Sequence, residues 1–416
     1  MSPATVAVVS RPQSSQVLSS PSTMHSRLIK GYDEFVALKP AWDRLCARLA
    51  SPPLFLSHEW LDAAWQWCGR QASLNIVACE RDGELVGVLP LLVRTDDRAA
   101  FRPRTMEFVA VPDTQRADIL AVDAERSAVA EACAAALALH RSEWDVMRLR
   151  YLPAEAIATN ELATALRKLR LNVSVNQSVQ NPWIALTSDW TSYYGARSRR
   201  LKKATNLAAN RMARAGTVTL EWLAPGQGTP LDVERALAIL TDISSRSWKQ
   251  GTGNSLDHPG PQAFIQRLAA HAHRRGWLST FTLALDGKPV ATEFQIVDGR
   301  DVYALRADFD GALEELSPGS HLSRLLLERL FGRAFHRYYM GPGVNAYKYR
   351  WAEGSDPVYS LTLYGSSPRG RALACWELAL KPALRGIRDR LRAAPNRATG
   401  DDEDVSQPGK SGSKPP

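Results

Sequence analysis

Two stretches of the chain, Leu74–Val93 (LNIVACERDGELVGVLPLLV) and Leu278–Val297 (LSTFTLALDGKPVATEFQIV), repeat one pattern. In each stretch an apolar run leads into an Asp-Gly pair, and a second apolar run follows. Asp-Gly is typical of the two-residue turn of a β-hairpin, because glycine supplies the positive φ that such a turn needs. The sequence therefore predicts two hairpins, which turn at Asp82-Gly83 and Asp286-Gly287.

The segments that follow the two hairpins also correspond. A helix-period segment follows each hairpin, at Glu125–His140 and at Ser320–Phe335, and a short strand follows each helix, at Trp144–Met147 and Arg337–Met340. Strands that alternate with helices indicate a mixed α/β (α+β) fold, and the repeat indicates two similar domains. We expect disordered tails at 1–26 and 394–416, domains at 27–187 and 188–368, and a basic amphipathic helix at 369–393.

Composition restricts the class of protein. The 416 residues are 45% hydrophobic and 23% charged, which is ordinary for a globular chain. No apolar run approaches the roughly 20 residues of a membrane-spanning helix, and the first residues lack the apolar core of a secretory signal, so we expect a cytoplasmic protein. Five cysteines without a CxxC pair predict neither a disulfide framework nor a zinc site.

The net charge of +9 permits an anionic partner, and two segments concentrate it. Residues 197–214 carry basic side chains and no acid, with Leu201, Ala204, Ala208 and Met212 at helical spacing on one face. This helix either presents a solvated charged face or contacts phosphates. The second segment is the helix at 369–393, which either docks on the second domain or lies at the periphery of an anionic membrane.

The run Leu316–Leu322 (LSPGSHL) has the composition of a helix start. Ser317 suits the N-cap, Pro318 suits the first helical position, and Gly319 and Ser320 leave backbone N–H groups uncovered. Exposed N–H groups and the helix dipole favour phosphate, so the turn either simply caps the helix or also holds a pyrophosphate.

The run Met340–Trp351 (MGPGVNAYKYRW) combines two glycines with Tyr347, Lys348 and Arg350. Such a mixture suits a ligand-facing loop, and a structural loop with surface cations is the alternative. The corresponding part of the first half, Met147–Pro153, lacks the paired glycines. If one half is active, we expect it to be the second.

A set of short motifs carries a family resemblance. They are Phe55–Trp60 (FLSHEW), Val86–Pro90 (VGVLP), the basic helix near Arg199, Ser247-Trp248-Lys249, Leu316–Gly319, Gly341–Gly343 (GPG) and Tyr347–Trp351 (YKYRW). In order and spacing, over about residues 28 to 368, they resemble the GNAT-fold acyltransferases of the CelD/BcsL family of cellulose and exopolysaccharide biosynthesis proteins. The resemblance implies kinship with FemAB-type transferases, which place two GNAT-like domains in tandem.

The resemblance implies acyl transfer from acetyl-CoA or another acyl-CoA, as co-substrate, to an amine or hydroxyl of a sugar-like acceptor. The pyrophosphate would be held by the turn at Ser317, Gly319, Ser320 and His321. The pantetheine would be held by the strand Val302–Arg306 and the strand near Tyr338. We expect Glu293, inside an apolar strand, to be the general base, because burial raises the pKa of a carboxyl. Pairing with an arginine is its alternative role.

The remaining site residues follow from the same implied cleft. Asp308 is the second candidate base, and Tyr347 is the expected acid for the departing thiolate. Lys348 and Arg350 would bind anions of acceptor or cofactor, and Trp248 would stack on an acceptor ring or belong to the core. The scattered His58, His271, His273 and His336 predict no metal site.

Two other functions compete with acyl-CoA-dependent transfer. Aminoacyl transfer from charged tRNA would use the basic helix at 197–214 as a phosphate contact. A non-catalytic binding module of a polysaccharide synthase complex is the other, because family members carry acids after the second glycine of the GxG turn where this chain has Val344 and Asn345.

Overall fold

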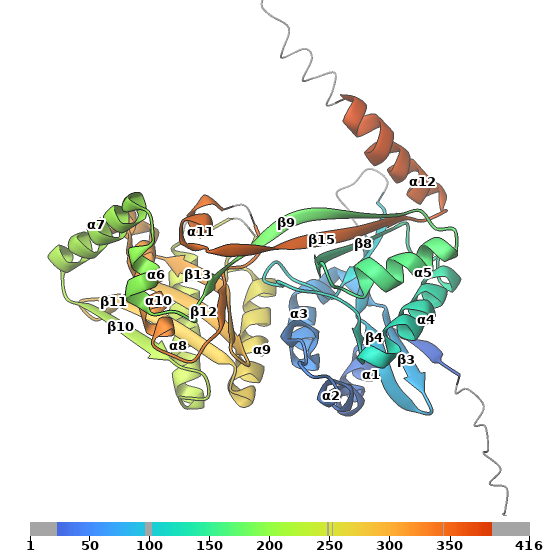
Figure 1. Cartoon of the computed structure of the whole chain (residues 1–416), viewed down its shortest axis with the longest axis horizontal. Coiled ribbons are helices and arrows are strands. Elements are labelled where there is room, and N and C mark those ends of the chain that lie inside the picture. Colours follow the sequence, from blue (N-terminus) through green and yellow to red (C-terminus); the bar gives the residue numbers. More distant parts are fainter. Residues whose placement is uncertain (1–22, 96–101, 248, 252, 344, 385–416) are drawn as a thin grey trace, which may run out of the picture.

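The structure is a computed structural model, and it describes residues 23–95, 102–247, 249–251, 253–343 and 345–384. Trp248, Val344, the tails up to residue 22 and from residue 394, and residues 385–393 of the expected C-terminal helix lie outside this description. Figure 1 shows two lobes connected by a long pair of strands. None of the helices in the described ranges combines the length and the apolar character needed to cross a bilayer.

The first lobe contains both predicted arms of the first hairpin. Its strands are β1 (His25–Ile29), β2 (Ala72–Leu74), β3 (Ile76–Arg81), β4 (Glu84–Leu89), β5 (Leu91–Thr95), β6 (Arg104–Phe108), β7 (Leu120–Ala121) and β8 (Val146–Pro153). Its helices are α1 (Tyr32–Ala37), α2 (Lys39–Ala47), α3 (His58–Cys68), α4 (Arg126–Leu139) and α5 (Ala163–Lys168).

The second lobe repeats this arrangement. Its strands are β10 (Val218–Leu223), β11 (Leu278–Leu285), β12 (Lys288–Asp298), β13 (Asp301–Phe309) and β14 (Arg337–Tyr339). Its helices are α6 (Trp190–Gly195), α7 (Arg199–Ala215), α8 (Pro230–Ser245), α9 (Pro259–Arg275), α10 (Pro318–Phe331) and α11 (Ala346–Trp351). Helix α12 (Pro368–Cys375) follows the last strand.

Both predicted hairpin turns are present. Asp82 and Gly83 have φ values of 53° and 77°, and Asp286 and Gly287 have φ values of 49° and 75°. Two consecutive residues with positive φ define the type I′ turn, whose twist matches that of antiparallel strands. The shared turn geometry confirms the two hairpins that the sequence predicts.

The long strands β9 (Val173–Ala185) and β15 (Gly354–Tyr364) join the lobes. β15 pairs with β9 on one side and with β8 of the first lobe on the other, while the end of β9 pairs with β14 of the second lobe. The described strands thereby form one eleven-stranded sheet, in the order β10-β11-β12-β13-β14-β9-β15-β8-β6-β5-β2, beside a four-stranded sheet, β1-β3-β4-β7. The division at residues 187/188 stays a prediction, and this strand pairing crosses it.

One hydrophobic core extends across both lobes. Helix α3 packs against α9 (Figure 1), and Trp60 and Phe264 meet edge to face with their ring centroids 5.5 Å apart. Phe55 meets Tyr303 in the same way at 5.1 Å. Aromatic pairs of this geometry add to the free energy of burial, so they fix the position of one lobe on the other.

The predicted basic helix is α7, with a shifted buried face. Leu201, Ala208 and Met212 are buried as expected, but Thr205 is buried in place of Ala204. The Thr205 hydroxyl donates to the Leu201 carbonyl at 3.1 Å and lies 2.6 Å from the Tyr194 hydroxyl. These hydrogen bonds allow a polar side chain to occupy the interior face.

Candidate active site

The strands β13 and β14 are parallel neighbours that separate after a short paired stretch. Their register ends at Tyr303 opposite Tyr339, whereas β13 continues to Phe309. Within the described residues no strand pairs with this side of β13 beyond Tyr303. The backbone of residues 304–309 therefore borders an opening between two central strands.

Side chains from other elements contact the carbonyls along this opening. Gln115 of the first lobe donates to the Ala304 carbonyl at 2.8 Å, and Lys249 donates to the Ala307 carbonyl at 2.7 Å. Across the opening, Lys348 donates to the Gly341 carbonyl at 2.8 Å. A Cβ on Gly341 would lie 3.5 Å from the Lys348 ammonium and 3.7 Å from the Ala304 carbonyl oxygen, so this end of the opening is narrow.

Glu293 lies on β12 and is buried. Its carboxylate accepts hydrogen bonds from the Tyr338 hydroxyl at 2.6 Å and from the Gln295 amide at 2.7 Å. Burial raises the pKa of Glu293, although the two hydrogen bonds and the ammonium groups of Lys249 and Lys348 act in the opposite direction. Its partners are therefore a phenol, an amide and two nearby lysines, and no arginine among the described residues pairs with it.

Lys348 is 7% exposed. Burial and the neighbouring positive charge of Lys249 lower the pKa of Lys348 to about 8, while Glu293 has the opposite influence. An amine of this kind is still largely protonated at neutral pH, and it is poorly solvated. It can therefore interact strongly with negative charge that develops nearby.

Asp308, the second candidate base, is also buried. Its carboxylate lies 3.0 Å from the Lys249 ammonium, and within the described residues it accepts no hydrogen bond of good geometry. Asp308 is thus one half of a buried ion pair that borders the opening. Glu293, by contrast, is hydrogen-bonded to neutral groups.

Tyr347 and Arg350 lie on α11, where the sequence suggested a loop; six residues from Ala346 to Trp351 form helix instead. The Tyr347 residue is 47% exposed, but the dense surroundings of its hydroxyl, with a contribution from Glu293 and Asp308, raise the pKa of the phenol to about 12. Arg350 is exposed, and no described residue forms an ion pair with it. The structure thus brings Tyr347 and Lys348 to the opening and leaves Arg350 at the surface.

The turn before α10 differs in detail from the predicted cap. The helix begins at Pro318 as expected, but Ser317 adopts a left-handed conformation with φ of 58° and its side chain caps no N–H. The N–H groups of Ser320 and His321 both donate to the Ser317 carbonyl, so the expectation that Ser320 leaves its backbone N–H uncovered is wrong. Ser320 is exposed, whereas His321 is buried, and within the described part of the chain its Nδ1 has no hydrogen-bond partner.

Sequence reasoning missed the contribution of the first lobe. Asp113 forms a buried ion pair with Arg306 of β13 at 2.7 Å, and Gln115 reaches the Ala304 carbonyl. Both residues lie in the segment between β6 and β7, far from β13 in the sequence. No local spacing or motif connects them to β13, so only the packing of the two lobes could have identified them.

The comparisons with known proteins agree with this arrangement. Residues 198–349 match the acetyltransferase (GNAT) domain family. This range begins at the cap of α7 and ends in α11, so it includes β12, β13, α10, β14 and Lys348. A comparison with curated protein sequences finds no match.

Three solved structures share the fold over most of this chain. FemX has a TM-score of 0.51 at 11% identity, over 85% of this chain and 99% of FemX. The C-terminal domain of a putative lysylphosphatidylglycerol synthetase from Agrobacterium fabrum has a TM-score of 0.51 at 12% identity, over 82% of this chain and 95% of that domain's chain. L-PGS from Bacillus licheniformis has a TM-score of 0.50 at 10% identity, over 85% of this chain and 95% of the L-PGS chain.

Identities this low show the fold alone. The match at residues 198–349 and the opening between β13 and β14 lie in the second lobe, and the first lobe repeats its hairpin, helix and strand. The chain is therefore a mixed α/β protein whose second half matches the acetyltransferase (GNAT) domain family over residues 198–349.

Proposed function

We propose that this protein is an acyltransferase that moves an acyl group from an acyl-CoA to an amine or hydroxyl of a sugar-like cell-envelope or exopolysaccharide precursor. The observation that carries the proposal is the opening between β13 and β14, bordered by the buried Glu293 and Lys348 and followed by the start of α10. The resemblance to the CelD/BcsL family supports the choice of acceptor.

The residues around the opening fit an acyl-CoA. The free edge of β13 offers carbonyls to the amides of a pantetheine, and the 14-residue helix α10 presents its N-terminal end beside that edge. Arg211 of α7 donates to the Glu315 carbonyl at 2.8 Å, so a guanidinium lies close to the turn where phosphates would bind. Ser317, Gly319 and Ser320 would border the pyrophosphate.

The side chains then have separate tasks. Glu293 accepts the proton of the attacking amine or hydroxyl, because its raised pKa makes it a better base than an exposed carboxylate. Lys348, as a buried ammonium, stabilises the negative charge that develops on the thioester oxygen. Tyr347 donates a proton to the departing sulfur and recovers one from solvent, to which it is partly exposed.

The experiment that tests this proposal measures thiol release from acetyl-CoA with a panel of amino sugars and sugar phosphates as acceptors. We expect acceptor-dependent release that is lost in Glu293→Gln, a variant that preserves the size of the side chain. Binding of glycans without thiol release from any acyl-CoA would instead support the non-catalytic binding module.

Helix α7 favours aminoacyl transfer from charged tRNA as a second candidate. Arg199, Arg200 and Lys203 are exposed on this helix, which lies at the outer edge of the second lobe in Figure 1, and among the described residues no acid pairs with them. Binding to a tRNA through these cations would weaken steeply with salt. A filter-binding titration of tRNA at two salt concentrations tests this candidate. If it is right, tRNA binding weakens steeply at the higher salt concentration, and acetyl-CoA gives no turnover in a separate assay.

A further inference from the structure

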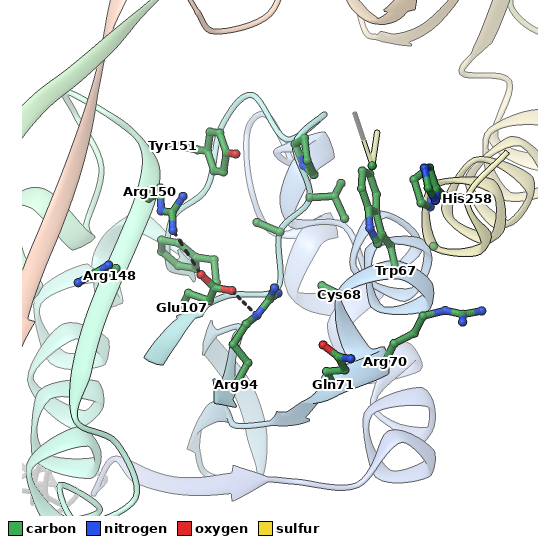
Figure 2. A pocket seen from close by; sticks show the side chains of 17 residues that line it. Trp67, Cys68, Arg70, Gln71, Arg94, Glu107, Arg148, Arg150, Tyr151 and His258 are labelled. Atoms are coloured by element: carbon green, nitrogen blue, oxygen red, sulfur yellow. Dashed lines mark ion pairs between the residues drawn. The ribbon is translucent and has the colours of Figure 1, made fainter. Parts of the chain in front are cut away.

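Apart from the opening between β13 and β14, a cavity of about 540 Å³ lies on the first lobe where it meets the segment before α9. Figure 2 shows its walls: Arg94, Glu107 and Arg150 come from β5, β6 and β8, and Trp67 and Arg70 come from the end of α3 and the turn after it. The volume is typical of small-molecule sites. None of the catalytic or binding residues that the sequence predicts lines this cavity.

The lining carries more positive than negative charge. Four arginines line the cavity, Arg70, Arg94, Arg148 and Arg150, and Glu107 is the acid among its lining residues. Glu107 lies 2.8 Å from Arg94 and 3.8 Å from Arg150, and Arg148 pairs with Glu377 outside the cavity. Beyond these pairs, one guanidinium charge remains where Arg94 and Arg150 both point toward Glu107, and a second lies at Arg70 on the opposite side of the view in Figure 2. The lining therefore suits a ligand with negative charge.

The other wall is aromatic and close-fitting. Trp67 lies so near Gly260, the second residue of α9, that a Cβ there would sit 2.4 Å from the indole ring. Tyr151, which also lines the cavity, has a φ of 64°, a strained conformation for a tyrosine. His258, the residue before α9, has a buried Nε2 that within the described ranges bonds to nothing. On this side, Trp67 can contact a flat ring of a ligand and His258 can bind one of its polar atoms.

We propose that this cavity binds a phosphoryl-bearing ligand with a ring, of the class of sugar phosphates and nucleoside diphosphates. The arginines bind the phosphoryl group, and Trp67 stacks on the ring. The cavity is separate from the opening between β13 and β14, but Arg306 of β13 lies over Trp67, 5.5 Å from its ring centroid. If the proposed function holds, a ligand here is the acceptor, and its ring, stacked on Trp67, lies on the side of β13.

Calorimetric titration of the full chain without acyl-CoA tests the proposal. The probes are UDP, a hexose 1-phosphate, uridine and inorganic phosphate. We expect UDP or the hexose phosphate to bind in the micromolar range, and the one that binds more tightly identifies the class of ring. Arg70→Gln and Arg150→Gln should each weaken this binding at least about tenfold. Arg48→Gln, at an exposed arginine directly after α2 and outside the cavity, should leave it unchanged.

Three results would overturn the proposal. They are no binding of either ring-bearing phosphate, equal affinity for inorganic phosphate and UDP, and ring-phosphate binding that both arginine variants retain. Titration of the same variants with acetyl-CoA separates the two sites, since its affinity should be unchanged; a loss there would assign the cavity to the acyl donor. A protein that binds the ring phosphates but not acetyl-CoA would keep this inference and lose the proposed function.

Discussion

The Tyr338 hydroxyl donates a 2.6 Å hydrogen bond to the carboxylate of Glu293, and both residues are buried. The bond joins β14 to β12 across β13, on the side where β13 and β14 separate. It orients the proposed base and favours its charged form. The burial that raises the pKa of Glu293 and the hydrogen bond that opposes the rise therefore act on the same carboxyl.

The first prediction concerns this pair. Glu293→Gln should lower kcat at least about a hundredfold, because it removes the general base, while the KM for acyl-CoA stays near its original value. Tyr338→Phe should retain more activity but move the acid limb of the pH profile of kcat/KM to higher pH, since the charged carboxylate loses a donor. Steady-state kinetics check both. Equal, pH-independent losses in the two variants would show a structural role only.

The pH dependence of the parent protein is the second prediction. Activity requires deprotonated Glu293, so kcat/KM should rise through a midpoint above the ordinary carboxyl value of 4.5. Activity also requires protonated Lys348, whose pKa is lowered to about 8, so kcat/KM should fall as the pH passes that value. Lys348→Arg should move the alkaline limb to higher pH because guanidinium stays protonated. An alkaline limb that does not move in this variant would exclude Lys348 as its source.

The third prediction concerns Gln115. Its side-chain amide occupies the Ala304 carbonyl, at the edge where a pantetheine amide would donate. Gln115→Ala removes this competitor, so the Kd for acetyl-CoA should fall about three- to tenfold, the value of roughly one neutral hydrogen bond. Calorimetry measures the change. Weaker binding in Gln115→Ala would show that Gln115 supports the donor site rather than competing for it.

The fourth prediction tests the contact between the lobes. Asp62 of α3 accepts hydrogen bonds from Tyr32 and from Arg267 and His271 of α9, each at 2.6 Å. Burial raises its pKa, but these hydrogen bonds outweigh burial and hold the pKa well below the ordinary value. Asp62→Ala should lower the free energy of unfolding by about 2 kcal/mol at pH 7, because it leaves the buried His271 without its partner, while the half-exposed Arg267 can turn to solvent.

The pH dependence of that loss has a defined sign. A carboxyl with a depressed folded-state pKa stabilises the fold above its unfolded pKa, near 3.9, and loses this effect as the pH falls toward the folded value. The difference between parent and Asp62→Ala should therefore be smaller at pH 3 than at pH 7 in urea unfolding. Glu34→Gln, in an exposed pair with Arg27, is the control and should change stability by less than about 1 kcal/mol.

Local patterns predicted the local elements well. The Asp-Gly pairs at 82–83 and 286–287 required positive φ, and Pro318 marked the start of α10. Glu293 could be selected because a carboxylate inside an apolar strand is expensive to bury without a purpose. These features depend on neighbours within a few residues, which a sequence displays directly.

The missed features depend on distant partners. β15 pairs with β8 of the other lobe, and no pattern within either strand indicates that pairing. Gln115 and Asp113 reach β13 only because α3 and α9 pack the lobes together. The glycines before residue 346 favoured the prediction of a loop at Ala346–Trp351. The structure has a helix there, which buries Lys348 and Trp351.

The most direct test of the central claim is a calorimetric titration of acetyl-CoA into the parent protein, Ser320→Glu and Ser320→Gln. Ser320 is exposed in the first turn of α10, where a carboxylate is compatible with the helix dipole and the fold should persist. We predict micromolar binding to the parent and to Ser320→Gln, and at least about tenfold weaker binding to Ser320→Glu, whose charge repels the pyrophosphate. No binding to the parent, or equal affinity in Ser320→Glu and Ser320→Gln, would contradict the account.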